Sequence, residues 1–341
     1  MDIHNRRAVR AAASEALRAN PGKPRKLALT YIAAIAGSTL LVSLLSIILN
    51  NRINATGGLG DLGLRSVLVT IQFCLPVAQI LSLLFMHLGY QKATVAIARH
   101  QAVHPRDLRQ GFRFFGPLLR VTLMQGLIYL MMDFITSTVA SYLFMLTPFF
   151  ADYAAASENL FNNATILNNA MVVDTELLFQ FYLKMLPMFC IWVPLFCITA
   201  LPFFYNCRMI NYVLAERPGT GALMAMGESG RMMLGNRMTL FKYDLRYWWY
   251  HLPRFLLSAF IFSSVLLILM DFPQSLTESA IICGIIAVCL LLMGLLHFFF
   301  LNKVETTYAT IYNALRPQPQ EKSGGAVLGN IFDLAREYKE D

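Results

Sequence analysis

The stretch LALTYIAAIAGSTLLVSLLSIIL, Leu27 to Leu49, contains no charged residue. A helix needs about 20 apolar residues to cross about 30 Å of hydrocarbon, so this stretch predicts a membrane-spanning helix. A cleavable signal peptide has a much shorter apolar core. We therefore expect the segment to remain in the protein as an anchor.

Apolar runs of similar length recur along the rest of the chain. They are Ser66 to Leu88, Leu118 to about Leu146, Leu178 to Tyr205, Leu252 to Met270 and Ala280 to Leu301. The chain is 57% hydrophobic and 14% charged, whereas soluble domains average about 45–50% and about 25%. Lipid cannot satisfy exposed backbone groups, which leaves helices as the spanning form. The sequence predicts an all-α bundle of six transmembrane helices over residues 27–301, with an amphipathic segment at 1–26 and a tail at 302–341.

Positive charge alternates between the connections of these six runs. Residues 1–26 hold seven Lys and Arg, and the connection between the fourth and fifth runs holds six. The connections 147–176 and 271–279 hold none. Basic residues stay on the cytoplasmic side of a bilayer, so the pattern predicts cytoplasmic N- and C-termini.

The stretch SGRMMLGNRMTLFKYDLRYWWY, Ser229 to Tyr250, mixes basic and aromatic residues beside the fifth run. Such a mixture suits single-stranded nucleic acid or a lipid headgroup surface. Its position beside a predicted span favours lipid over nucleic acid. The apolar spacing predicts one helix that lies along the inner leaflet and contacts anionic headgroups. Its predicted apolar stripe is Met233, Leu240, Phe241, Leu245, Trp248 and Trp249, and its candidate lipid-interface residues are Arg237, Lys242, Arg246, Trp248 and Trp249.

Two other basic segments predict cytoplasmic amphipathic helices of the same kind. Asn5 to Leu17 carries Val9 and Ala13 on one side, and Pro105 to Arg120 carries Leu108 and Phe112. Each segment directly precedes a run that heads outward, so we expect each to lie at the membrane surface.

Polar side chains within the runs form a candidate intramembrane polar network. Its members are Asp133, Gln72, Gln79, Gln125 and Lys184. A carboxylate at membrane depth is expensive and should face protein or water. These groups either line a polar path or simply bond between helices. The three prolines of the fourth run favour a broken helix, a feature of transport sites.

The stretch Gly227 to Tyr250 also carries a resemblance. Ser229, Met233, Gly235, Asn236 and Phe241, followed by Trp248, resemble the signature of the bacterial integral membrane family catalogued as domain of unknown function 975. The segments LRQGFRFF (108–115) and TYATIYNAL (307–315) are similar to other parts of that family. The resemblance implies a multi-pass protein of the bacterial cell (inner) membrane, with no established activity or catalytic residues.

The sequence offers no catalytic constellation. It lacks a metalloprotease His pair, a nucleophile elbow and a phosphate-binding loop, so we expect neither an enzyme nor a cofactor or metal site. The leading hypothesis is a non-catalytic membrane scaffold or accessory protein. An amphipathic stripe in the tail (Ile331, Leu334, Ala335 and Tyr338) suggests a protein partner. The alternative is a small-solute, ion or lipid transporter that uses the network around Asp133.

Overall fold

The computed structural model describes residues 2–55, 62–162, 165–167, 170–172, 175–217, 219–269 and 276–316. The all-α prediction is confirmed, because most of the described chain is helical and its strands are limited to one hairpin of two three-residue strands. The helices and strands are α1 (Arg6–Ala19), α2 (Pro24–Ala55), α3 (Leu62–Ala98), η2 (Pro105–Phe114), α4 (Phe115–Met145), α5 (Phe149–Asn162), β1 (Thr165–Leu167), β2 (Ala170–Val172), α6 (Thr175–Cys207), α7 (Ile210–Glu216), α8 (Ala222–Met233), α9 (Arg237–Arg246), α10 (Trp248–Leu269) and α11 (Leu276–Leu315).

Five stretches of helix in the described chain are long and apolar enough to cross a membrane. They are Pro24–Ile53, Gly63–Ala98, Pro105–Met145, Phe179–Glu216 and Ala280–Leu315. They correspond to five of the six predicted runs, to within one residue at the ends. The remaining run coincides with α10, a 22-residue helix that is not among the five. The structure thus supports a membrane protein without confirming the count of six spans.

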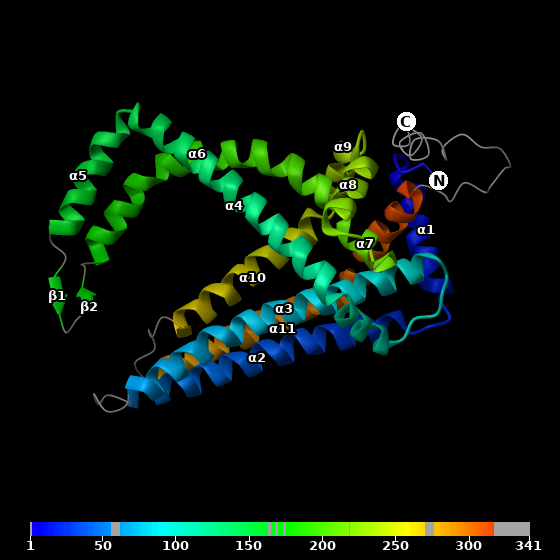
Figure 1. The fold of residues 1–341 in the computed structure, drawn as a ribbon, viewed down its shortest axis with the longest axis horizontal. Coiled ribbons are helices and arrows are strands. Elements are labelled where there is room, and N and C mark those ends of the chain that lie inside the picture. Colours follow the sequence, from blue (N-terminus) through cyan, green and yellow to red (C-terminus); the bar gives the residue numbers. More distant parts are fainter. Residues whose placement is uncertain are drawn as a thin grey trace, which may run out of the picture.

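The long helices form two separate groups (Figure 1). In the first, the four-helix group, α3 and α11 both pack on α2, and α10 packs on α11 and α2. In the second, the helix pair, α4 packs along α6, and α5 covers the far end of α6. The helix pair diverges from the four-helix group, so the two are joined mainly at one end of the molecule.

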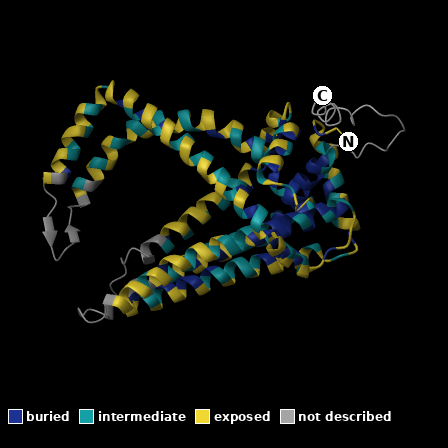
Figure 2. Ribbon diagram, in the orientation of Figure 1, coloured by how far each residue is buried: buried dark blue, intermediate teal, exposed yellow. Residues whose placement is uncertain are grey.

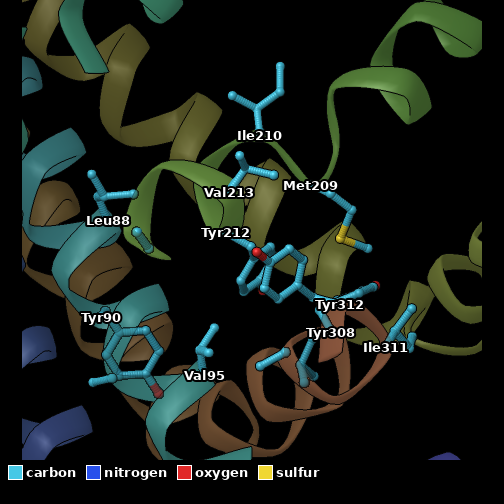
Figure 3. Packing of buried hydrophobic residues seen from close by; sticks show 14 of the residues in the cluster. Leu88, Tyr90, Val95, Met209, Ile210, Tyr212, Val213, Tyr308, Ile311 and Tyr312 are labelled. Atoms are coloured by element: carbon cyan, nitrogen blue, oxygen red, sulfur yellow. The ribbon is translucent and has the colours of Figure 1, made fainter. Parts of the chain in front are cut away.

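That end, the packed end, consists of α1, η2, α7, α8, α9 and the adjoining ends of α3 and α11. Figure 2 shows that buried residues gather there, whereas exposed and intermediate residues alternate along the long helices. Every residue of α7 from Tyr212 to Ala215 is buried. The ring of Tyr212 stacks on Tyr312 of α11 with centroids 5.5 Å apart, beside Met209 and Ile210 (Figure 3). The packed end therefore has a dense apolar core.

Ion pairs strengthen the packed end around one acid. The Glu216 carboxylate lies 2.9 Å from Arg99 and 2.6 Å from Arg316, and it accepts a hydrogen bond from the Tyr312 hydroxyl at 2.6 Å. These partners come from the residue that follows α3, from α11 and from the residue that follows α11. A single carboxylate at the end of α7 thus ties three chain segments together.

Two glycines allow η2 to lie directly on α3. A Cβ atom added to Gly89 would come 2.2 Å from the Leu108 carbonyl oxygen, and one added to Gly111 would come 1.8 Å from the Phe85 carbonyl oxygen. No side chain fits at such distances, so the close approach of the two backbones requires glycine at both positions.

The fold corrects two sequence expectations and shows what one connection contains. The fourth run is one continuous helix, α6, with Pro187, Pro194 and Pro202 inside it, so its prolines do not break it. The connection 147–176, identified in the sequence only as a link between two predicted spans, holds α5 and the β1–β2 hairpin, in which Thr165 faces Val172. The stretch Ser229 to Tyr250 is not a single helix, as described next.

Candidate interfacial site at the packed end

Two breaks divide the predicted interfacial helix into parts of α8, α9 and α10. Gly235 has φ +78°, a conformation that side chains disfavour, and it separates α8 from α9. Tyr247 separates α9 from α10, and its backbone N–H bonds back to the carbonyls of Tyr243 and Asp244. Trp248 and Trp249 therefore begin α10 and do not belong to α9.

The short helix α9 has one buried and one exposed face. Leu240 and Tyr243 are buried in the main core, and so is Met233 at the end of α8. The prediction that Met233 and Leu240 belong to the exposed stripe is therefore wrong. The break at Gly235 changes the helix direction, so a single helical period cannot be carried across it.

The exposed face of the same region contains every predicted lipid-interface residue. Arg237, Lys242, Arg246, Trp248 and Trp249 are all exposed. Large apolar side chains accompany them, with exposed fractions of 73% for Leu234, 63% for Met238 and 58% for both Leu245 and Trp248. A surface that exposes apolar and cationic side chains together suits the boundary between headgroups and acyl chains.

Four arginines converge beside this face. A cavity of about 220 Å³ is lined by Arg6, Arg7 and Arg10 of α1 and by Arg246 and Tyr243 of α9. Within the described chain, no ion pair engages any of these arginines. We call this cavity the arginine pocket. Its clustered positive charge makes it a candidate site for a phosphate-bearing anion.

Tyr243 holds the two walls of the arginine pocket together. Its hydroxyl donates a hydrogen bond to the Ile3 carbonyl oxygen at 3.1 Å, which links α9 to the residues before α1. Burial raises the pKa of Tyr243 to about 12. The phenol therefore stays neutral near pH 7 and does not offset the arginine charges.

α1 is attached to the protein through its apolar side. Val9, Ala13 and Ala16 are buried, and the helix packs on α11 and α3. The Asn5 side chain accepts a hydrogen bond from the Ala8 backbone N–H and caps the helix start. The apolar side predicted to enter lipid thus enters the protein core, which leaves the arginines on the outer surface.

Asp244 anchors the inner side of α9. Its carboxylate accepts hydrogen bonds from the hydroxyls of Tyr205 (2.8 Å) and Tyr308, and it lies 3.5 Å from the Arg208 guanidinium. The guanidinium also lies over the Tyr308 ring, 4.7 Å from its centroid. α6, α9 and α11 meet at this carboxylate, which fixes the position of the exposed face.

Ser229 of the signature stretch has a structural role. Its hydroxyl donates to the Asn206 carbonyl oxygen at 2.5 Å and accepts from the Met209 backbone N–H at 3.1 Å. It thereby satisfies backbone groups in the turn between α6 and α7, where helical hydrogen bonds are lost. The sequence resemblance identified this serine without explaining it.

The candidate polar network is divided between the two groups of long helices. Gln79 of α3 donates to the Thr39 hydroxyl of α2 at 2.8 Å, and Gln72, also on α3, is buried. Gln125 and Asp133 belong to α4, on the diverging helix pair. Lys184 of α6 pairs with Asp152 of α5 at 3.0 Å. The structure therefore gives Gln79 and Lys184 partners outside the proposed network.

The fold and this site define the class: an all-helical chain whose apolar helices suit a membrane and whose packed end presents a cationic surface. A family model described as "Protein of unknown function (DUF975)" matches residues 1–318. The chain belongs to this family, as the signature residues predicted. No curated protein and no solved structure matches the chain.

Proposed function

We propose that the protein is a non-catalytic scaffold or accessory protein of a bacterial inner membrane, with its packed end at the cytoplasmic surface. The arginine pocket is the observation that carries this proposal. Four arginines that form no ion pair with any residue the structure describes lie beside an exposed apolar face. Anionic headgroups would occupy the pocket while Leu245 and Trp248 enter the acyl boundary.

A role in organising other proteins follows from this arrangement. Headgroup binding would hold α1 and α9 against the bilayer, and the C-terminal tail would extend from the end of α11 toward a partner. The tail residues 317–341 lie outside the described residues. Deletion of residues 326–341 should abolish co-purification of a partner after crosslinking in the membrane. Recovery of the protein alone from intact membranes would argue against a scaffold.

Lipid quenching of tryptophan fluorescence tests the arginine pocket. In a Trp192→Phe background, Trp248 and Trp249 report on the lipids beside α9. Full-length protein in vesicles should be quenched more by brominated phosphatidylglycerol than by brominated phosphatidylcholine at equal fraction. The triple change Arg6→Gln, Arg7→Gln and Arg10→Gln should remove most of this preference, since each cation near the surface contributes about 1 kcal/mol.

A second triple variant provides the matched control. Arg18, Arg25 and Lys26 are exposed basic residues near α1 that do not line the pocket. Their replacement by Gln removes the same charge and should leave most of the preference intact. If both triple variants lost the preference for phosphatidylglycerol equally, the preference would result from overall positive charge. This result would contradict a defined pocket.

A further inference from the structure

A second cavity lies inside the four-helix group and shares no lining residue with the arginine pocket. It has a volume of about 510 Å³ and is lined by α2, α3, α10 and α11, within the usual range for small-molecule sites. Each helix contributes one polar residue to the end nearest the packed end: Tyr31, His87, Arg254 and His297. We call these four residues the polar layer.

Beyond the polar layer the cavity wall is largely apolar. Ile35 of α2, Leu83 of α3, Ile261 of α10 and Met293 of α11 follow, and Val265 lies at the far end of the α10 wall. Eleven residues separate Arg254 from Val265, which corresponds to about 16 Å along a helix. The cavity thus has a charged head and an apolar length, the shape of an amphiphile.

Arg254 supplies the only charge that is fixed at neutral pH among the residues lining the cavity. In the described chain it forms no ion pair with a carboxylate. The buried acid Glu305 of α11 instead accepts a hydrogen bond from Tyr212 at 3.2 Å. A guanidinium in an apolar bundle is costly without a counter-charge, and an anionic ligand would provide one.

The two histidines of the polar layer are oriented by neighbours. His87 Nδ1 lies 3.0 Å from the Tyr31 hydroxyl, and His297 Nδ1 lies 2.8 Å from the Met293 carbonyl oxygen. These contacts hold both rings in place. Because a carbonyl oxygen only accepts, neutral His297 donates through Nδ1 and keeps Nε2 as an acceptor, which suits a headgroup hydroxyl and not the anion itself. A headgroup at Arg254 therefore meets groups that are already positioned.

The cavity opens sideways between α3 and α10. Ile80 of α3 and Phe262 of α10 both line it, yet they are 53% and 60% exposed. Both residues lie within apolar helices, so the medium outside this opening is the acyl region of the bilayer. A ligand would enter from the membrane and not from water.

We propose that this cavity binds one anionic lipid, with its headgroup at Arg254 and one acyl chain along the apolar wall. Phosphate and carboxylate headgroups share the chemistry that Arg254 recognises, and both hydrogen-bond well to a guanidinium. The proposal does not depend on the arginine pocket, because the two sites share no residue.

Native mass spectrometry of the full-length protein tests the proposal. The delipidated protein is incubated in detergent with phosphatidylglycerol, with phosphatidylcholine of the same chains, or with oleate. We expect one tightly retained phosphatidylglycerol and about tenfold weaker retention of phosphatidylcholine. Arg254→Gln should remove this difference. Strong retention of oleate would extend the site to carboxylate headgroups, whereas equal retention of all three lipids would overturn the proposal.

Two tryptophan substitutions on α10 separate this cavity from lipid on the outer surface. Ser258→Trp places a large ring inside the cavity, and Ala259→Trp places the same ring outside its lining. Only the first should abolish the retained lipid, with both variants checked for folding by thermal unfolding. Unchanged retention in Ser258→Trp would overturn the proposal.

Lys303→Gln provides a charge control on α11. Lys303 is exposed and lies outside both cavities. Its replacement should leave the retained lipid unchanged. A loss equal to that of Arg254→Gln would mean that surface charge, and not the cavity, selects the lipid, and would overturn the proposal. A variant can lose the retained lipid while Trp248 and Trp249 are still quenched more by brominated phosphatidylglycerol. That result would concern the cavity alone and would not contradict the proposed interfacial function.

Discussion

The four-helix group and the helix pair both consist of long apolar helices, but they differ in the hydrogen bonds that their polar residues form. In the four-helix group, side chains bond between helices, as Gln79 does to Thr39 and Tyr31 to His87. On α4 of the helix pair, the hydroxyls of Thr136 and Thr138 bond to carbonyls of their own helix. Hydropathy alone therefore does not reveal which helices form a specific bundle.

The difference also concerns what each region is attached to. The ends of α3 and α11 enter the packed end, where Glu216 and Asp244 join several helices. The helix pair has its most distant part in α5, away from that core. Leu127, Leu130 and Phe134 of α4 are more than 60% exposed. We expect substitutions to be costly near the packed end and mild along the helix pair.

The largest contrast should come from two glycines. Gly111→Ala introduces a Cβ atom 1.8 Å from the Phe85 carbonyl oxygen, so α3 and η2 must separate. The loss should reach about 3 kcal/mol or more. Gly126→Ala on α4 meets no atom within 4 Å and should be neutral or stabilising by up to about 1 kcal/mol. Thermal unfolding of both variants in one detergent measures the two changes in stability. Equal changes would contradict the close backbone contact between α3 and η2.

Two acids provide the next contrast. Asp244→Asn removes the charge that faces Arg208 and weakens the bonds from Tyr205 and Tyr308. Because both charged side chains are partly exposed, at 19% and 27%, we expect a loss of about 2 kcal/mol. Asp133→Asn on α4 should change stability by less than about 1 kcal/mol.

The same Asp133→Asn variant tests the transporter alternative. If the inserted protein keeps its stability but loses a solute-dependent phenotype, a transport role for Asp133 gains support. If stability falls as far as in Asp244→Asn, Asp133 has a structural partner, and the contrast between the two regions fails. Reconstituted vesicles and thermal unfolding provide the two measurements.

The fold class could be predicted because it depends on local composition. Runs such as Leu27 to Leu49 identify helices by length and hydropathy alone. It was harder to predict where each helix is interrupted. Three prolines lie inside α6 without breaking it, whereas a break with Gly235 at positive φ separates α8 from α9. A proline loses one backbone bond in a helix held by neighbours, whereas a residue with positive φ cannot continue a helix.

The sites were only partly predictable. Arg246 was identified from its own segment, but its neighbours in the pocket, Arg6 and Arg10, lie more than 200 positions earlier in the chain. Arg254 was missed because it falls within an apolar run, where one cation hardly changes mean hydropathy. A search for isolated cations inside predicted spans would have found it.

Removal of one hydrogen bond inside the four-helix group should have a moderate effect on stability. Gln79→Leu removes the bond to Thr39 and should destabilise the protein by about 0.6 kcal/mol, the average for such bonds between membrane helices. Thr138→Val on α4 removes only a bond within its own helix, so its effect should be smaller. Thermal unfolding of both variants compares the two values, and the reverse order would contradict the contrast.

The smallest effect should come from the ion pair at the far end of the helix pair. Lys184 and Asp152 lie 3.0 Å apart, but their side chains are 46% and 60% exposed. If water reaches this end, Lys184→Met should change stability by less than about 0.5 kcal/mol, and the change should vanish in 1 M salt, where charges are screened beyond about 3 Å. Arg99→Met, which removes a partner of the less exposed Glu216, should cost more and respond less to salt. A large loss of stability in Lys184→Met that does not depend on salt would indicate that this ion pair lies in lipid. The helix pair would then be held by specific contacts, as the four-helix group is.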